Sequence, residues 1–179
     1  EYALSQGNID LINSFREYYK RWSIYFEEDE IIITNGGSEA LIFAYSTIGD
    51  CGDEILVPEP FYANYNGFAV QAGMKIKPIT TKAEEGFHLP PIEEIEKLIT
   101  TRTKAIAVSN PGNPTGTVYT REELEMLGKL AKKYNIFLIG DEVYKEFVYD
   151  DLKFTSLMHI KGIEDRVIIV DSISKRYSA

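Results

Sequence analysis

Short apolar runs alternate with helix-like segments along the chain, and this alternation constrains the fold more than any other feature. Runs of β-branched residues are typical of buried strands, whereas apolar residues three or four positions apart indicate a helix. We expect strands near residues 31–34, 54–57, 75–79, 104–109, 136–140 and 167–171. Helices at several of the crossings favour an α/β fold with a doubly wound, mostly parallel sheet flanked by helices.

The helical segments carry start signals of their own. Apolar residues recur at helical spacing over residues 9–22, and Asn8 or Asp10 can cap the start of that helix. Thr120 and Glu123 form the capping-box pattern of a helix that continues to residue 134. Further helices are expected over residues 40–45, 61–73 and 92–99.

Composition restricts the class of protein. The chain has 179 residues, 44% of them hydrophobic, which is enough for a globular domain with a sizeable core. Its 28 acidic and 19 basic side chains give a formal charge of -9, which argues against a nucleic-acid surface. No apolar run approaches the roughly 20 residues of a membrane span. The single Cys51 excludes an intrachain disulfide framework and favours a reducing, cytoplasmic location.

Chemically distinctive residues follow four of the expected strands. They are Gly36–Ser38, Asn113, Asp141 and Lys175. The carboxyl ends of parallel strands lie at one edge of a sheet, where open α/β sheets bind their ligands. We therefore expect these four groups to meet in space. The two histidines, His88 and His159, show no metal-ligand spacing.

Each group also has a plainer interpretation. Gly36, Gly37 and Ser38, between a strand and a helix, can bind an anion such as phosphate, or can form a tight turn with Ser38 as helix cap. Lys175 can act as a nucleophile or Schiff-base former if it is partly desolvated, or can be a solvated loop residue. Tyr62 can stack on a flat ligand or pack in the core.

Together the groups suit one ligand especially well. An anion site, an aromatic ring, an amide, a carboxylate and an amine match a flat ligand with a phosphate, a basic ring nitrogen and an aldehyde. Pyridoxal 5'-phosphate has each of these features. A lysine would hold the aldehyde, and a carboxylate would pair with the protonated ring nitrogen.

Three spaced motifs resemble those of a known family. They are Asn-Pro-Thr-Gly at 113–116, Asp-Glu-Val-Tyr at 141–144 and Ser-Ile-Ser-Lys at 172–175. In this order and at these separations they resemble the class I/II aminotransferases, which are pyridoxal-phosphate enzymes of fold type I. The resemblance covers essentially the whole chain.

The resemblance implies a role for each matching residue. Lys175 would be the catalytic residue, which holds the cofactor and then moves a proton between substrate and cofactor. Asp141 would pair with the pyridine nitrogen. Asn113 and Tyr144 would hydrogen-bond the ring's 3'-oxygen.

The remaining cofactor contacts follow from the same resemblance. Gly36, Gly37 and Ser38 would hold the phosphate, with help from Ser172. Tyr62 would stack on the ring, at a position where the aspartate enzymes of the family often carry Trp.

The resemblance also has consequences for assembly. Tyr2 matches a family tyrosine that reaches the phosphate of the neighbouring subunit, which implies a homodimer with shared active sites. We expect residues 1–179 to form the cofactor-binding large domain, as a fragment of a longer protein. The small domain and the arginines that bind the substrate carboxylates would then lie outside this chain.

The implied activity is transfer of an amino group from an L-amino acid, with aspartate or aromatic substrates expected, to a 2-oxo acid. Two alternatives remain open. One is another reaction on the same cofactor, such as that of a C–S lyase or an aminocyclopropane-carboxylate synthase. The other is a non-catalytic aminotransferase-like domain of a regulator.

Overall fold

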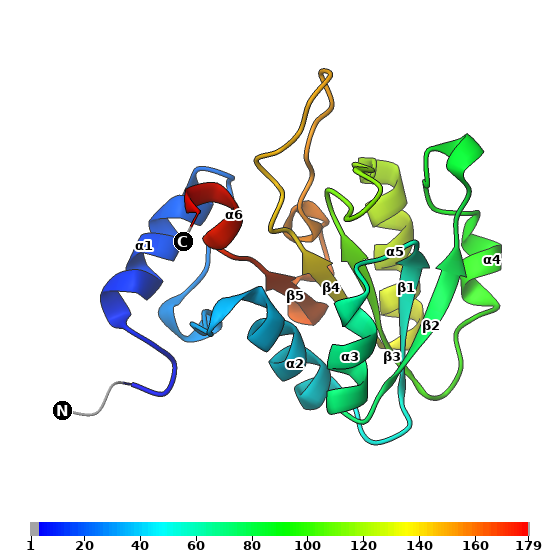
Figure 1. The fold of residues 1–179 in the computed structure, drawn as a ribbon, viewed down its shortest axis with the longest axis horizontal. Coiled ribbons are helices and arrows are strands. Elements are labelled where there is room, and N and C mark those ends of the chain that lie inside the picture. Colours follow the sequence, from blue (N-terminus) through cyan, green and yellow to red (C-terminus); the bar gives the residue numbers. More distant parts are fainter. Residues whose placement is uncertain (1–3, 179) are drawn as a thin grey trace. The chain divides into compact units, whose positions relative to one another are not determined.

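The computed structural model describes residues 4–178. The chain divides into two compact units, one ending at Asn35 and the other beginning at Gly36. The first unit contains α1 (Ile9–Lys20) and the short 3-10 helix η1 (Glu28–Glu30). The second unit contains the sheet and the remaining helices (Figure 1).

A five-stranded parallel sheet organises the second unit. Its strands are β1 (Glu54–Glu59), β2 (Lys75–Thr80), β3 (Thr103–Ser109), β4 (Phe137–Asp141) and β5 (Val167–Val170). They lie in the order β2-β1-β3-β4-β5, and each neighbouring pair is parallel. The order reverses direction after β2, as in doubly wound sheets, so the predicted fold class is confirmed.

The predicted strand at residues 31–34 is wrong. This segment has no regular secondary structure, and its backbone bonds to Gln6 instead of to a neighbouring strand. The Ile33 amide donates to the Gln6 carbonyl at 2.8 Å, and Gln6 Nε2 donates to the Ile31 carbonyl at 2.8 Å. An apolar β-branched run indicates that a segment suits a sheet, but it cannot indicate whether a partner strand is present.

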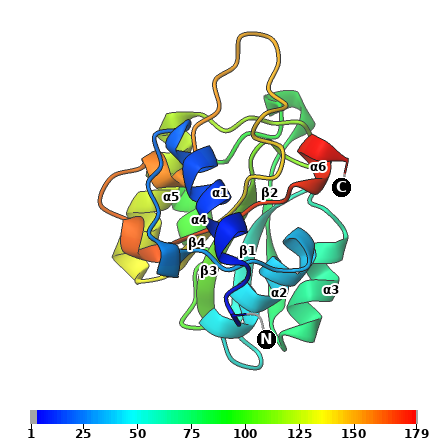
Figure 2. The ribbon, with the colours of Figure 1, turned by 90° about the vertical axis from the view of Figure 1, so that its left-hand side faces the viewer.

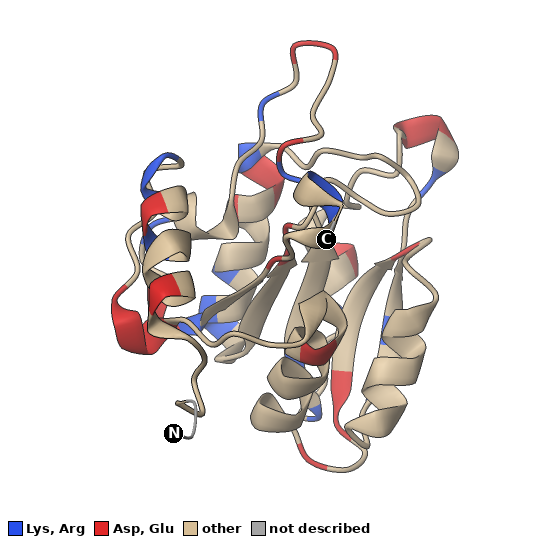
Figure 3. Cartoon of the chain, turned by 60° about the vertical axis from the view of Figure 1, so that its left-hand side comes forward, with Lys and Arg blue, Asp and Glu red and all other residues tan. Residues whose placement is uncertain are grey.

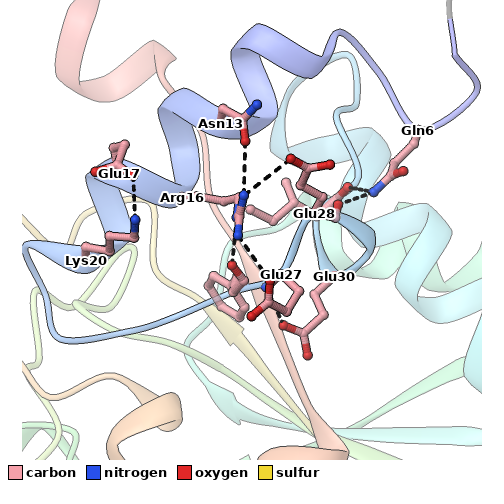
Figure 4. Close-up of polar contacts among 10 residues, drawn as sticks. Gln6, Asn13, Arg16, Glu17, Lys20, Glu27, Glu28 and Glu30 are labelled. Carbon is pink, nitrogen blue, oxygen red and sulfur yellow. Dashed lines mark hydrogen bonds and ion pairs between the residues drawn. The ribbon is translucent and has the colours of Figure 1, made fainter.

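Polar contacts of Arg16 hold the first unit together (Figure 4). Its guanidinium donates to the Phe26 carbonyl at 2.9 Å and pairs with Glu27 at 3.1 Å and with Glu28 at 3.4 Å. These bonds connect α1 to the segment that contains η1. The helix itself starts as predicted, because the Asn8 side chain accepts from the amides of residues 10 and 11.

Helices cover both faces of the sheet in the second unit. The helices are α2 (Gly36–Ile48), α3 (Asn64–Gln71), α4 (Ile92–Glu96), α5 (Arg121–Tyr134) and α6 (Ser174–Tyr177). Short 3-10 turns occur at η2 (Ala83–Glu85), η3 (Leu157–His159) and η4 (Glu164–Arg166). Figures 1 and 2 show α2 and α3 side by side, with α4 and α5 on the opposite face of the sheet.

Alternate residues of each strand pack into two separate cores. In β3, Ala105 and Ala107 belong to the core that contains α2 and α3 residues, and Ile106 and Val108 belong to the core that contains α5 residues. Most of the charged residues lie on the helices and loops (Figure 3). The two buried faces fix the register of the sheet and therefore the position of each strand end.

No helix within residues 4–178 has both the length and the apolar character required to cross a membrane.

The start of α5 also fixes a neighbouring loop. Thr120 Oγ1 accepts from the Glu123 amide at 3.2 Å, and the Glu123 carboxylate accepts from the Thr120 amide at 2.7 Å, which confirms the predicted capping box. The same carboxylate accepts from the Leu89 amide at 2.7 Å and contacts His88 Nδ1 at 2.9 Å. Thus one carboxylate caps the helix and anchors the loop before α4.

Thr120→Ala should lower the free energy of unfolding by about 1 kcal/mol, because the first turn of α5 loses a hydrogen-bond acceptor. Thr120→Ser, which keeps the hydroxyl, should lower it by only a few tenths of that amount. Urea unfolding of the two variants measures both values. Equal stabilities for Thr120→Ala and the parent protein would show that the capping box contributes nothing.

Candidate active site

A cavity of about 240 Å³ lies at the carboxyl ends of the strands. Every predicted site residue within the described chain lines it: Gly36, Gly37, Ser38, Tyr62, Asn113, Asp141, Tyr144, Ser172 and Lys175. Tyr2 lies outside the described residues. The lining residues come from the start of α2, the segments after β1, β3 and β4, and the segment after β5. The expected convergence at one sheet edge is therefore present.

Gly36, Gly37 and Ser38 form the first residues of α2. No strand precedes them, contrary to the prediction, but the turn and the helix start are present. Gly36 has a φ of +80°, which favours glycine. A Cβ on Gly37 would lie 3.6 Å from Val170 Cγ1 and 3.7 Å from the Asp171 carbonyl, so this helix start lies close to the end of β5. The start of a helix offers backbone amides and the positive end of the helix dipole to an anion.

Asp141 ends β4, and its carboxylate is buried beside the cavity. Its Oδ2 accepts a short hydrogen bond from the Tyr65 hydroxyl. Its Oδ1 is buried and has no hydrogen-bond partner among residues 4–178. Burial raises the pKa of Asp141 above its ordinary value, although the Tyr65 hydroxyl and the Val143 amide oppose the change. A cationic N–H donor in the cavity would satisfy the free oxygen and keep the carboxylate charged.

Tyr65 is a site residue that the sequence reasoning missed. It is 1% exposed, and burial raises the pKa of its hydroxyl well above the ordinary value. Tyr62 precedes α3 and Tyr65 lies in its first turn, and their rings meet edge to face at 5.9 Å. Both line the cavity, so the short separation between Tyr62 and Tyr65 is the one sequence signal for Tyr65.

Lys175 lies in α6, the helix that follows β5 after a short connecting segment. Its Nζ is 5.9 Å from the centre of the Tyr144 ring. Ser172 Oγ accepts from the Ser174 amide at 3.2 Å, which supports the turn into α6. The lysine, the tyrosine and the serine all line the cavity.

Asn113 belongs to a loop that Asn110 fixes in place. Asn110 is 2% exposed, and its amide donates to the Thr155 carbonyl at 3.0 Å. Its Oδ1 accepts from the Tyr119 amide at 3.0 Å. The Asn110–Pro111 and Asn113–Pro114 peptide bonds are both cis. Asn110 thus holds both ends of the loop that brings Asn113 to the cavity.

The arrangement fits the cofactor that the sequence indicates. The start of α2 offers amides to a phosphate, Asp141 Oδ1 offers an acceptor to a ring N–H, and Lys175 offers an amine to an aldehyde. A metal centre has no comparable basis, because no group of three His, Cys, Asp or Glu side chains suited to a metal occurs within the described range.

Comparison with known proteins decides the family. The sequence profile of the family described as "Aminotransferase class I and II" matches residues 1–179. The chain belongs to this family. The resemblance inferred from the three motifs is therefore confirmed.

Known aminotransferases match the chain over most of its length. The aspartate aminotransferase of Thermotoga maritima is 38% identical over 99% of this chain and 45% of its own length. The structure of an aromatic aminotransferase from Pyrococcus horikoshii superposes with a TM-score of 0.93 at 29% identity, over 99% of this chain and 48% of that one. An alanine aminotransferase structure from Pyrococcus furiosus gives a TM-score of 0.88 at 36% identity, over 97% and 44% of the two chains. The chain thus spans a little under half the length of these relatives.

The chain also buries Glu142, which follows Asp141 but does not line the cavity. Glu142 Oε1 accepts from Ser156 Oγ at 2.8 Å and from the Leu157 amide at 3.0 Å, which ties the end of β4 to η3. Its Oε2 is buried without a hydrogen-bond partner in the described structure. Burial raises the pKa of Glu142 to about 7, although Ser156, Leu157 and Lys145 oppose the change.

The raised pKa of Glu142 predicts a pH dependence of stability. Between the ordinary pKa of 4.5 and the folded-state pKa of about 7, the native Glu142 keeps a proton that the unfolded chain has released. The stability gained from protonated Glu142 is fully present below pH 4.5 and is lost as the pH rises through about 7. Between these pH values, each unit of rising pH should lower the free energy of unfolding by roughly 1 kcal/mol.

Glu142→Gln should remove this part of the slope, because the amide does not titrate. Glu125→Gln, at an exposed position of α5, is the matched control and should keep the parental slope. Denaturant unfolding at several pH values between 4.5 and 7 measures the slopes. An unchanged slope in Glu142→Gln would contradict the assigned pKa.

Proposed function

We propose that the protein containing this chain is a pyridoxal-phosphate-dependent aminotransferase. It would transfer an amino group from an L-amino acid to a 2-oxo acid. The observation that carries the proposal is the free, buried Asp141 Oδ1 in the cavity that Lys175 and the start of α2 also line. Pyridoxal phosphate, when bound, supplies an electron sink for the negative charge that develops on the substrate carbon.

The chain's residues divide the work of binding and proton transfer. Lys175 would hold the cofactor through Nζ and would carry a proton to and from the substrate carbon. Asp141 would keep the ring nitrogen protonated. Asn113 and Tyr144 would donate hydrogen bonds to the ring's 3'-oxygen and so orient the ring.

Other residues that line the cavity would contact the cofactor's phosphate and the face of its ring. The amides of Gly37 and Ser38, the Ser38 hydroxyl and the Ser172 hydroxyl would hold the phosphate at the start of α2, with Gly36 providing the turn. Tyr62 would pack on the ring face.

Tyr2 would reach the phosphate of a neighbouring subunit in a homodimer, so that two chains share each site. The residues up to 179 would form the cofactor-binding large domain of a longer, cytoplasmic protein. Aspartate and aromatic amino acids are the proposed substrates, because the relatives named above include an aspartate and an aromatic aminotransferase.

Incubation of the full-length protein with pyridoxal phosphate, aspartate and 2-oxoglutarate tests the reaction. Formation of glutamate and oxaloacetate in equal amounts is the expected result. Pyruvate and ammonia released from cysteine or a related thioether without an acceptor acid would instead indicate a lyase. A covalent adduct with no turnover of any amino acid would indicate a regulatory domain.

Lys175→Ala should abolish the covalent adduct between protein and cofactor, because no other cavity-lining residue among those described carries an amine. Borohydride reduction followed by peptide mass spectrometry detects the adduct on the 172–177 segment of the parent protein. Lys161→Ala, at an exposed lysine away from the cavity, should keep the full yield. A reduced adduct at the parental yield in Lys175→Ala would remove Lys175 from this role.

A further inference from the structure

Three charged side chains are buried behind the cavity wall. Lys145, Asp171 and Arg176 have side-chain exposures of 0%, 7% and 3%. They come from the turn after β4, the end of β5 and α6, which are separate elements of the sheet edge. None of the three belongs to the cavity lining, so they do not contact a ligand in the cavity directly.

The three form one ion-pair cluster centred on Asp171. The Arg176 guanidinium grips the carboxylate with two nitrogens, Nη1 to Oδ1 at 2.8 Å and Nη2 to Oδ2 at 3.2 Å. Lys145 Nζ donates a short bond to Oδ2. Arg176 Nε also lies 3.5 Å from the half-exposed Glu146. Such two-pronged contacts define the position of an arginine more narrowly than a single bond does.

The charges of the cluster support one another. Burial favours the neutral form of Asp171, but Lys145 and Arg176 outweigh burial and hold its pKa below the ordinary value. Burial lowers the pKa of Lys145, and Asp171 opposes that change. A buried ion pair generally adds little net stability compared with apolar side chains. Stability alone therefore gives no reason to bury three charges at this place.

The sequence positions of the cluster give a different reason. Each member is the immediate neighbour of a cavity-lining residue: Lys145 follows Tyr144, Asp171 precedes Ser172, and Arg176 follows Lys175. Fixing the three buried side chains therefore fixes the backbone that carries the three lining residues.

The effect is largest for Lys175. Helix α6 has only 4 residues, too few to be stable without tertiary contacts. Consecutive helical side chains point about 100° apart around the axis. With Arg176 held in the interior by Asp171, the rotation of α6 is set, and Lys175 is directed toward the cavity side where Tyr144 lies.

We propose that Lys145, Asp171 and Arg176 act as positioning residues that hold Lys175 in the cavity. The identity of the cofactor that Lys175 binds rests on the proposed function, but the positioning of the lysine does not. The two hydrogen bonds from Arg176 to Asp171 contribute most to the position of Lys175, because they set the rotation of α6 about its axis.

Arg176→Lys in the full-length protein tests the inference. This change keeps the positive charge but removes the two-pronged grip on Asp171. Arg166→Lys is the matched control. Arg166 pairs with Asp165 at 2.9 Å at the other end of β5, before its first residue. Far-UV circular dichroism and urea unfolding establish that both variants fold.

The first measurement needs no cofactor. Lysines methylated with ¹³C-formaldehyde give NMR signals, and Lys175→Arg identifies the Lys175 signal by its loss. In the parent protein, this signal should be displaced by the nearby Tyr144 ring. In Arg176→Lys it should lose the displacement caused by the Tyr144 ring, while in Arg166→Lys it should stay displaced.

The second measurement uses pyridoxal phosphate. Arg176→Lys should bind it at least about tenfold more weakly, with a reduced visible circular dichroism, because small displacements of a reacting group are costly. Arg166→Lys should bind it as tightly as the parent protein.

Lys145→Met replaces Arg176→Lys if that variant does not fold, because it leaves the Asp171–Arg176 ion pair intact. Its control is Lys104→Met, at a lysine that pairs with Asp53 at 3.5 Å.

The two proposals fail in different ways. A parental Lys175 signal in folded Arg176→Lys, or in Lys145→Met if that variant is used, would overturn the positioning role, whatever the protein catalyses. A displaced signal that moves as expected, in a parent protein that forms no adduct with pyridoxal phosphate, would support the positioning role and refute the proposed function.

Discussion

The buried Asp141 carboxylate is the constraint on which the site depends. Removing a carboxylate from water is costly unless its oxygens are bonded. Tyr65 satisfies one oxygen, and the other has no partner within the described chain. A donor bound in the cavity would satisfy this oxygen. The protonated ring nitrogen of the proposed cofactor would do so and would also keep Asp141 ionised.

The parallel sheet brings the residues of the site together at one edge. Register pairs Asp141 with Ser109 on β3 and with Val170 on β5, so the three strands end at one level. The segments that follow them carry Asn113, Tyr144 and Lys175 to the same edge. Two apolar cores, one on each face, hold the strands in this register. The reactive groups therefore depend on a core that none of them belongs to.

Much of this could be predicted from sequence, because the signals are local. Strand-like runs and turn residues indicated the five strands, and the motifs after β3, β4 and β5 indicated Asn113, Asp141 and Lys175. The strand expected at residues 31–34 was wrong because pairing is a property of the fold and not of the segment.

Two layers of the site were not predictable in this way. Tyr65 acts through its contact with Asp141, which is 76 positions later in the chain. The cluster of Lys145, Asp171 and Arg176 consists of charged residues that usually lie at the surface, and no local pattern distinguishes them from solvated ones. Such residues become visible only when burial and partners are known.

The protonation state of the cofactor's ring nitrogen tests the central claim most directly. Pyridoxal phosphate labelled with ¹⁵N in the ring, bound to the full-length protein, should give the NMR shift of a protonated nitrogen up to alkaline pH. In Asp141→Asn, the nitrogen should lose its proton near neutral pH. An unprotonated nitrogen in the parent protein, or one that Asp141→Asn leaves unchanged, would contradict the account.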